Sequence, residues 1–129
     1  MTQAMEAVTS AALGLALDAA SLRQQAIATN IANANVPGYA PLSVNFEGQL
    51  EDARRTLAGG RRLASDALDG IAPRVEAGTD GGALDLSPKV LLDVQTAQMA
   101  QNAIQYQALA KGLAKHYALL SVAMSDGKK

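Results

Sequence analysis

The chain has 129 residues, a formal net charge of −1 and no cysteine; 27 of its residues are alanine and only four are aromatic. This length makes a single domain the upper bound, and the near-neutral charge argues against nucleic acid as the main partner. The absence of cysteine excludes disulfides, thiol catalysis and Cys-ligated metal sites. A core built mainly of alanine is thin for this length, so we expect part of the apolar surface to contact other subunits.

The charged residues are concentrated in the middle of the chain. Residues 1–45 carry only Glu6, Asp18 and Arg23, whereas residues 46–85 carry thirteen charges and residues 86–125 carry four. No run of 18 consecutive apolar residues is present, and no basic residue precedes the apolar segment near the N-terminus, as a cleaved signal peptide would require. We therefore expect two packed ends, a solvated middle and no cleaved signal.

The first segment predicts one long helix over residues 3–34, because it is rich in Ala, Leu and Gln and has no proline before Pro37. Two rows of apolar residues recur at helical spacing, the first of them alternating three and four residues as a coiled-coil seam does. The first row is Met5, Val8, Ala12, Leu15, Ala19, Leu22 and Ala26, and the second is Leu13, Leu17, Ala20, Ile27 and Ile31. A helix with two apolar rows and so little charge is expected to pack between several neighbours, with Leu15, Leu22, Ile27 and Ile31 as candidate assembly residues.

A turn follows this helix. Proline has no amide donor and pushes the preceding residue out of the helical region, so the helix must end before Pro37. Pro37-Gly38 is typical of a type II turn with glycine at the positive-φ position. Asn30, Asn33 and Asn35 crowd the helix end, where their side chains can hydrogen-bond freed backbone groups.

The middle of the chain predicts one short helix. Phe46, Leu50, Ala53 and Leu57 fall at helical spacing within residues 44–57, with Ser43 or Asn45 as the N-cap. Residues 58–85 are interrupted by glycine and proline, which predicts a long irregular loop. Within this loop the pattern allows a short hairpin near residues 71–75.

The last element is a second long helix. Ser87 as N-cap and Pro88 at the first helical position predict its start, and its pattern runs to about Met124. Its principal seam is Leu92, Thr96, Met99, Ala103, Tyr106, Ala110, Leu113, Tyr117, Leu120 and Met124. The candidate assembly residues of this seam are Met99, Tyr106, Leu113, Tyr117 and Leu120.

These elements predict an all-α fold. Two long terminal helices pair antiparallel as a coiled-coil-like hairpin, with a short helix and a long irregular loop between them. The chain divides into residues 1–36 as the N-terminal helix, residues 37–85 as the turn, short helix and charged loop, and residues 86–129 as the C-terminal helix.

The sequence offers little material for catalysis. His116 is the only histidine and is expected to be a partly exposed interface residue, because no carboxylate or metal-ligand pattern accompanies it. The acidic residues of the loop fit no calcium-binding template, and Gly59-Gly60-Arg61-Arg62 lacks the Gly-Lys-Ser/Thr of a phosphate-binding loop. We predict no catalytic residue, no cofactor, no metal site and no small-molecule substrate.

The segment from Asn30 to Tyr39, Asn-Ile-Ala-Asn-Ala-Asn-Val-Pro-Gly-Tyr, resembles the N-terminal signature of bacterial flagellar axial proteins, the rod and hook family. Members carry Asn-Ile-Ala-Asn, two spacer residues and then Thr-Pro-Gly-Tyr, and here Val36 stands where threonine is usual. The resemblance makes Asn30, Asn33, Pro37, Gly38 and Tyr39 the family's signature turn.

The second half of the chain is also similar to this family. The matching segments are Leu84-Asp85-Leu86, Met99-Ala100-Gln101-Asn102 and Tyr106-Gln107-Ala108-Leu109. The chain looks like the short proximal-rod members, which lack the domain inserted between the terminal helices of hook and distal rod proteins. Those members usually carry glutamate where Gln101 stands.

The resemblance implies a structural role rather than a catalytic one. It implies export through the flagellar type III apparatus without a cleaved signal, followed by assembly at the base of the periplasmic rod. The implied partners are copies of this chain, other rod subunits, basal-body base proteins and the export gate.

The segment from Phe46 to Leu50 resembles the Phe-x-x-x-hydrophobic element by which early rod and hook subunits engage that gate. The residues alone favour equally a one-turn apolar pair, Phe46 and Leu50, that packs on the long helices.

An alternative reading is a secreted helical-hairpin adaptor that forms a discrete soluble dimer. Proteins of this kind from type VII secretion carry Trp-x-Gly at the hairpin turn, whereas this chain has no tryptophan and some 50 residues between its long helices. A membrane-active amphipathic protein would need a cationic polar face, which three charges in residues 1–45 do not supply.

Overall fold

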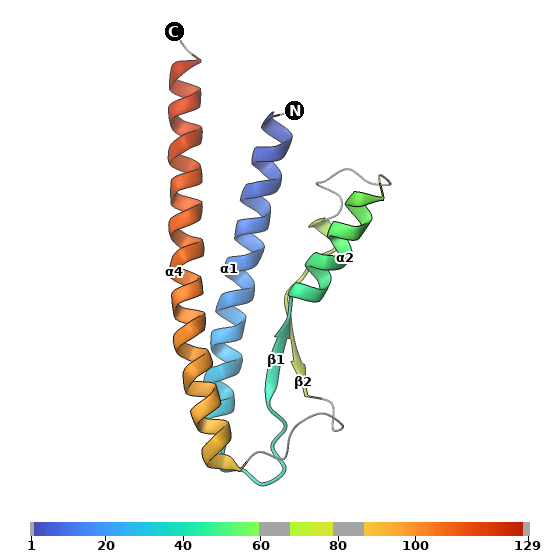
Figure 1. The fold of residues 1–129 in the computed structure, drawn as a ribbon, viewed down its shortest axis with the longest axis vertical. Helices are drawn as coiled ribbons and strands as arrows, with labels where there is room; N and C mark the ends of the chain where they lie inside the picture. The colour runs from blue at the N-terminus through green and yellow to red at the C-terminus, as the bar shows by residue number, and fades with distance from the viewer. Residues whose placement is uncertain (1, 60–67, 79–86, 128–129) are drawn as a thin grey trace.

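The computed structural model describes residues 2–59, 68–78 and 87–127. Its elements in chain order are α1 (Thr2–Ala32), β1 (Leu42–Asn45), α2 (Glu47–Ala58), β2 (Arg74–Ala77) and α4 (Pro88–Asp126). The chain is mostly helical, and its two longest elements are the terminal helices α1 and α4 (Figure 1). The helical class predicted from the two periodic ends is therefore confirmed.

Helix α1 is the central element of the molecule. Figure 1 shows α4 along one side of α1 and the β1–β2 pair with α2 along the other, and α1 contacts α4, β1 and β2. The two apolar rows of α1 explain this position, because each row supplies a packing surface for one neighbour.

The first row of α1 packs against the strands and α2. The core cluster consists of Ala19 and Ala26 from α1 together with Val44, Phe46, Ala53, Leu68 and Ile71. Val8, Ala12, Leu15, Ala16, Leu22 and Leu42 are partly buried against it. Because alanine projects only one methyl group from the helix, the aromatic ring of Phe46 and the β1 backbone can approach α1 closely.

The second row of α1 faces α4, where the contact includes polar side chains. The Asn102 amide donates to the Ala20 carbonyl oxygen and to Gln24 Oε1, both at 2.8 Å. Nearer the N-terminus of α1, His116 Nε2 lies 3.3 Å from the carbonyl oxygen of Glu6. Higher residue numbers in α4 thus meet lower numbers in α1, and Figure 1 shows the first turn of α1 and the last turns of α4 at the same end of the molecule.

The last turns of α4 extend beyond α1. Since His116 lies level with Glu6 and α1 begins at Thr2, residues after Leu120 have no counterpart on α1. Figure 1 shows this overhang.

The all-α expectation is wrong in one respect, because β1 and β2 form an antiparallel pair in which Val44 lies opposite Val75. Val44, expected in the short helix, belongs to β1, and α2 begins only at Glu47. Residues 58–85 contain β2, which overlaps the segment near residues 71–75 where the sequence allows a short hairpin, but the partner of β2 is β1 rather than a neighbouring segment. Both strands have only four residues and are far apart in sequence, so neither has a period long enough to recognise.

The face that α4 turns toward α1 is displaced from the expected seam. Its buried residues are Leu91, Gln95 and Asn102, whereas Leu92 and Tyr106 of the expected seam are exposed. The displacement arises because two of the three buried residues are amides, which a search for apolar periodicity counts as surface.

The predicted helix start and turn are confirmed. Ser87 Oγ accepts a hydrogen bond from the Val90 amide at 3.4 Å, and Pro88 occupies the first position of α4. Gly38 has a φ of 73°, and the Tyr39 amide donates to the Val36 carbonyl at 3.2 Å, as a turn with glycine at its third position requires. The Leu84-Asp85-Leu86 and Arg61-Arg62 segments lie outside the described residues.

One described segment, Met5–Ala32 in α1, is long and apolar enough by length and composition to cross a membrane. A mostly buried core helix and a signal sequence near the N-terminus pass the same test, and 11% of the apolar window is buried in this structure. Here that segment is covered on two sides, by α4 and by the β1–β2 pair.

Enlarging an alanine of the first row tests this packing. Replacing Ala19, which is buried in the core cluster, with leucine should lower the free energy of unfolding by about 1–3 kcal/mol, because the added methylenes overpack the contact with the strand layer. Ala11 is exposed on the same helix, so Ala11→Leu is the matched control and should leave stability within about 0.5 kcal/mol. Urea unfolding followed by circular dichroism measures both, and equal stabilities would contradict the packing.

Candidate functional site

Asn30 is the first residue of the turn segment identified by resemblance and is only 1% exposed. Its Nδ2 donates to the Leu42 carbonyl at 2.8 Å and to Gln95 Oε1 at 3.1 Å. Its Oδ1 accepts from the Leu42 amide and from the Tyr39 hydroxyl, both at 2.7 Å. Asn30 therefore uses two donors and two acceptor positions, which is the full capacity of a carboxamide.

The contact between Asn30 and Leu42 imitates a β-ladder. In a sheet, a neighbouring backbone would donate to one carbonyl and accept from one amide of the same residue, and the Asn30 side chain does both. The strand β1 is thus paired with β2 on one edge and with a side chain of α1 on the other. The Gln49 side chain forms the same pair of hydrogen bonds with the backbone of Ala72. It donates to the Ala72 carbonyl and accepts from the Ala72 amide, at 3.0 Å each.

Tyr39 connects the turn to the side-chain carboxamide of Asn30. Its hydroxyl donates to Asn30 Oδ1, so the residue directly after Pro37-Gly38 is held against the end of α1. Burial raises the pKa of the Tyr39 phenol above its ordinary value, and the neutral phenol is the form that can donate this bond.

Arg23 secures the second half of β1. Its Nη2 donates to the Val44 carbonyl at 3.2 Å and to the two carboxylate oxygens of Glu47 at 2.8 and 2.9 Å. One of the few charges of α1 therefore fixes both the strand and the first turn of α2.

The structure separates the signature residues into two groups. Asn30 and Tyr39 join directly, whereas Asn33 donates to the Thr29 carbonyl within its own helix end, and Pro37 is exposed. Pro37 and Gly38 shape the chain reversal that delivers Tyr39 to Asn30.

Phe46 and Leu50 lie one turn apart at the start of α2, and the Leu50 amide donates to the Phe46 carbonyl at 3.0 Å. Phe46 is 6% exposed within the core cluster, and Leu50 is 38% exposed. In the folded chain, Leu50 alone of this pair is accessible to a partner.

The candidate assembly residues fall into three environments. Ile27 is buried, and Tyr106 and Tyr117 are exposed. The half-buried members are Leu15, Leu22, Ile31, Met99, Leu113 and Leu120. The two tyrosines are therefore the members of the predicted set that point away from the chain's own packing.

Sequence reasoning did not identify Gln95, Asn102 or Arg23 as contact residues. A signal for them exists, because Gln95, Asn102 and His116 are spaced by multiples of seven on α4, which returns each to the same face of a packed helix. Arg23 could have been singled out as an isolated charge on an otherwise apolar helix.

His116 is half-buried, and its nearest ring lies on Tyr117, with centroids 6.1 Å apart. Among residues 2–59, 68–78 and 87–127, no group of three or more histidine, aspartate or glutamate side chains is placed to hold a metal ion. The described polar contacts bind the elements of the chain to one another.

Two comparisons bear on the identity of the chain. The sequence profile of the family described as "Flagella basal body rod protein" matches residues 13–39, which span most of α1 and the Pro-Gly-Tyr turn. A curated relative, the flagellar basal body rod protein FlgB of Borrelia hermsii, is 35% identical over 77 residues. The match covers 60% of this chain and 55% of the relative, so the chain spans about half the length of the curated protein that it matches.

The matched residues include the Asn30–Tyr39 cluster, and they support a flagellar basal body rod protein. Within that class, the similarity is to FlgB. The resemblance read from the Asn-Ile-Ala-Asn and Pro-Gly-Tyr residues is thus confirmed.

Removal of the Asn30 amide should destabilise the fold strongly. Asn30→Ala leaves the Leu42 amide and carbonyl and the Tyr39 hydroxyl without their partners, and each buried unpaired group costs about 1–3 kcal/mol. We expect a loss of about 3 kcal/mol or more in the free energy of unfolding, measured by urea denaturation. Asn33→Ala, which removes one bond at a more exposed position, should cost less than about 1 kcal/mol, and equal effects of the two substitutions would refute the central role of Asn30.

Proposed function

We propose that the chain is a structural, non-enzymatic subunit of the bacterial flagellar proximal rod. In this role it is exported through the flagellar type III apparatus and assembles through its terminal helices into a helical tube that transmits torque. Copies of the chain, other rod subunits and the base of the basal body are its partners. The matches to the rod family and to FlgB of Borrelia hermsii support this proposal.

The observation that carries the proposal is the exposed apolar surface of α4. Ile104 and Met124 are each 69% exposed, Leu119 is 61% exposed, and Tyr117 and Val122 are also more than half exposed. Large apolar side chains exposed along one helix favour an interaction with a partner. Because these residues lie on one helix and extend into the overhang past α1, the surface suits a partner that runs alongside the helix.

The terminal helices pair antiparallel in this proposal. Polar contacts at three levels support that arrangement: Asn30 with Gln95, Gln24 with Asn102, and Glu6 with His116. Polar residues at heptad-spaced positions of a helix interface fix its register, because any shift would leave buried amides unpaired.

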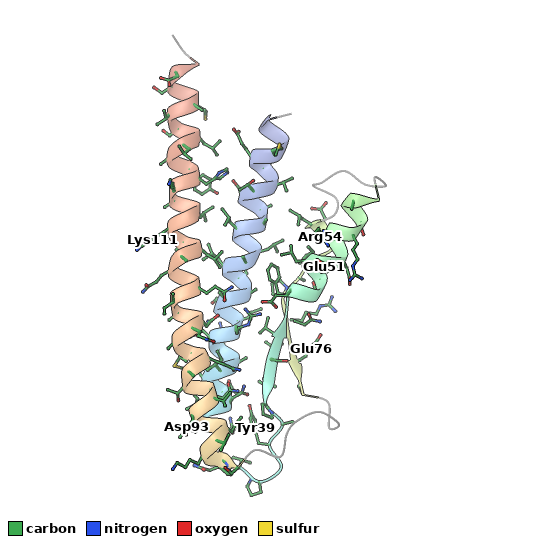
Figure 2. All side chains as sticks on the ribbon, viewed as in Figure 1. Tyr39, Glu51, Arg54, Glu76, Asp93 and Lys111 are labelled. Atoms are coloured by element: carbon green, nitrogen blue, oxygen red, sulfur yellow. The ribbon has the colours of Figure 1, made fainter. Side chains whose placement is uncertain are left out.

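Helical assembly requires a contact that is not self-complementary and does not close. A contact between two different faces of the same chain, repeated by a rotation that does not close, generates a filament. The apolar surface of α4 supplies one face. A different exposed face lies on the charged α2, where Glu51 forms ion pairs with Arg54 and Arg55. Arg54 and Glu51, labelled in Figure 2, have exposed side chains on α2.

A charge on the exposed face of α4 tests the assembly. Leu119→Asp should abolish incorporation into rods and hence motility, because the carboxylate would be buried between subunits. The helicity of the purified variant should not change, since Leu119 is exposed in the free chain. Leu113 and Leu120 are less suitable, because they flank His116 on the face toward α1 and their replacement would also disturb that contact.

The matched control is Lys111→Asp, which introduces the same residue on the same helix at a position that already carries charge. Fractionation of basal bodies and motility in soft agar measure both variants. Motile cells carrying Leu119→Asp would rule out this face of α4. A single, stable dimer of the unmodified chain in size-exclusion chromatography would favour the soluble adaptor instead.

The export step of the proposal concerns Phe46 and Leu50. The two residues are available together only in an unfolded chain, since folding places Phe46 in the core cluster and leaves Leu50 alone accessible. A chain that crosses the export apparatus unfolded can present the pair to the gate and bury Phe46 afterwards. Phe46 can therefore bind the export gate before the chain folds and pack in the core cluster afterwards.

Leu50→Ala separates these two readings. Because Leu50 is partly exposed, the substitution should leave the fold nearly unchanged while lowering the secreted fraction several-fold, and Phe46→Ala with Leu50→Ala should lower it further. Val75→Ala truncates an aliphatic side chain of similar exposure outside the element and is the control. Immunoblots of culture supernatant and cells measure export; normal secretion of the double variant would exclude the gate assignment.

A further inference from the structure

Phe46 is covered by the folded chain although it lies next to exposed positions. It stands between the last residue of β1 and the first residue of α2. Phe46 is 6% exposed and belongs to the core cluster with Ala19 and Ala26 of α1. A partner that binds its ring can therefore do so only when residues 42–58, which we call the strand–helix element, have moved away from α1.

One side chain of α1 straddles Phe46. Nη2 of Arg23 donates to the Val44 carbonyl, two residues before Phe46, at 3.2 Å. The same atom donates to both carboxylate oxygens of Glu47, one residue after Phe46, at 2.8 and 2.9 Å. We call these bonds the Arg23 clasp. Because they start from a single atom, the end of β1 and the first turn of α2 are released together when that side chain moves.

The strand–helix element is placed to open without disturbing the helix pair. It lies on the side of α1 opposite α4, as Figure 1 shows, and β1 contacts α1 and β2. Only Val44, Phe46 and Ala53 of the element belong to the core cluster. Segments held by a few apolar contacts and by exposed hydrogen bonds open locally more often than the whole chain unfolds.

The two ends of β1 are held with different strength. At Leu42, the Asn30 side chain forms two hydrogen bonds with the strand and is itself 1% exposed. Beside Phe46, the attachment is an ion pair whose side chains are 23% exposed at Arg23 and 65% exposed at Glu47. Ion pairs at such exposure are screened by water and shift an equilibrium by a few-fold at most. The element is therefore held firmly at Leu42 and loosely beside Phe46.

We propose that the Arg23 clasp is an autoinhibitory contact for export. While it is closed, Phe46 is covered; when it opens, Phe46 and Leu50 can bind the export gate together. A partner that binds only the open form has its apparent affinity lowered by the fraction of chains that are open. This inference rests on the proposed export of the chain and adds a means of regulating it, because closing the clasp withdraws a folded subunit from the gate.

Hydrogen exchange of the purified chain measures the opening without any partner. The Leu50 amide donates to the Phe46 carbonyl, so its exchange reports opening of the first turn of α2. Arg23→Ala and Glu47→Ala should each speed this exchange about three-fold, and the double variant should exchange no faster than Arg23→Ala, because both remove the same clasp. Unchanged exchange in both single variants would overturn the clasp.

The matched control is Arg54→Ala. It removes an arginine–glutamate pair of the same length, 2.8 Å, from the same element, but the partner, Glu51, lies on α2 itself and not on α1. Exchange of the Leu50 amide should therefore remain nearly unchanged. An effect as large as that of Arg23→Ala would assign the change to α2 alone and overturn the clasp.

The sign of the effect on export in cells is the decisive observation. Arg23→Ala and Glu47→Ala should raise the secreted fraction about two- to three-fold, measured by immunoblots of culture supernatant and cells, because more chains are open. Combining Arg23→Ala with Phe46→Ala should abolish the gain, since the clasp acts by covering that ring. A gain that persists without Phe46 would overturn the inference.

Asn102→Ala distinguishes opening of the clasp from general destabilisation. It removes two hydrogen bonds between α4 and α1 and none in the strand–helix element. It should lower the free energy of unfolding while leaving Leu50 exchange and the secreted fraction unchanged. Equal secretion gains from Asn102→Ala and Arg23→Ala would overturn the specific role of Arg23.

The remaining outcomes separate this inference from the proposed function. Unchanged secretion of both clasp variants, with faster Leu50 exchange, would overturn the autoinhibitory contact and leave export of the unmodified chain as proposed. Secretion of the unmodified chain that persists in cells lacking the flagellar export apparatus would overturn the proposed function itself.

Discussion

The arrangement of this chain depends on the Asn30 carboxamide. Four segments meet at this one buried group: the end of α1, the turn through Tyr39, the first residue of β1, and α4 through Gln95. The site requires two donors on one atom and an acceptor on the other, in one plane. An aspartate would present no donor, and a glutamine would place the same group one carbon farther from the helix, so asparagine suits the geometry.

This constraint explains why the helix pair relies on amides rather than charges. A charge enclosed between α1 and α4 would need a counter-charge and full solvation by protein groups, whereas an amide needs only hydrogen bonds. Gln95 and Gln24 each accept a hydrogen bond from an asparagine of the other helix, and Asn102 Nδ2 also donates to the Ala20 carbonyl, while Asn102 Oδ1 has no partner among the described residues. These hydrogen bonds restrict the relative position of α1 and α4, because a shift of either helix by one residue would break them.

The sequence predicted the long helices, the Ser87 cap and the glycine turn, because each has a local cause: periodicity, capping chemistry or proline sterics. It did not predict the β1–β2 pair, whose partners are about 30 residues apart and whose outer edge is closed by a side chain of α1. The importance of Asn30 was visible only by resemblance. Its contacts with Leu42 and Gln95 join distant parts of the chain, which no local pattern reports.

The alanine content now has a structural explanation that differs between the two helices. In α1, Ala19, Ala20 and Ala26 let neighbours approach from both sides, so the chain's own packing uses both apolar rows. Among the described elements, helix α4 packs mainly on α1, and it carries apolar residues such as Ile104 and Leu119 that the described part of the chain leaves exposed. Most of the exposed large apolar side chains therefore belong to the helix that lies outermost and extends farthest, although Met5, Val36, Leu50 and Val75 are also exposed. An arrangement of this kind holds α1 within the subunit and leaves α4 to meet the next one.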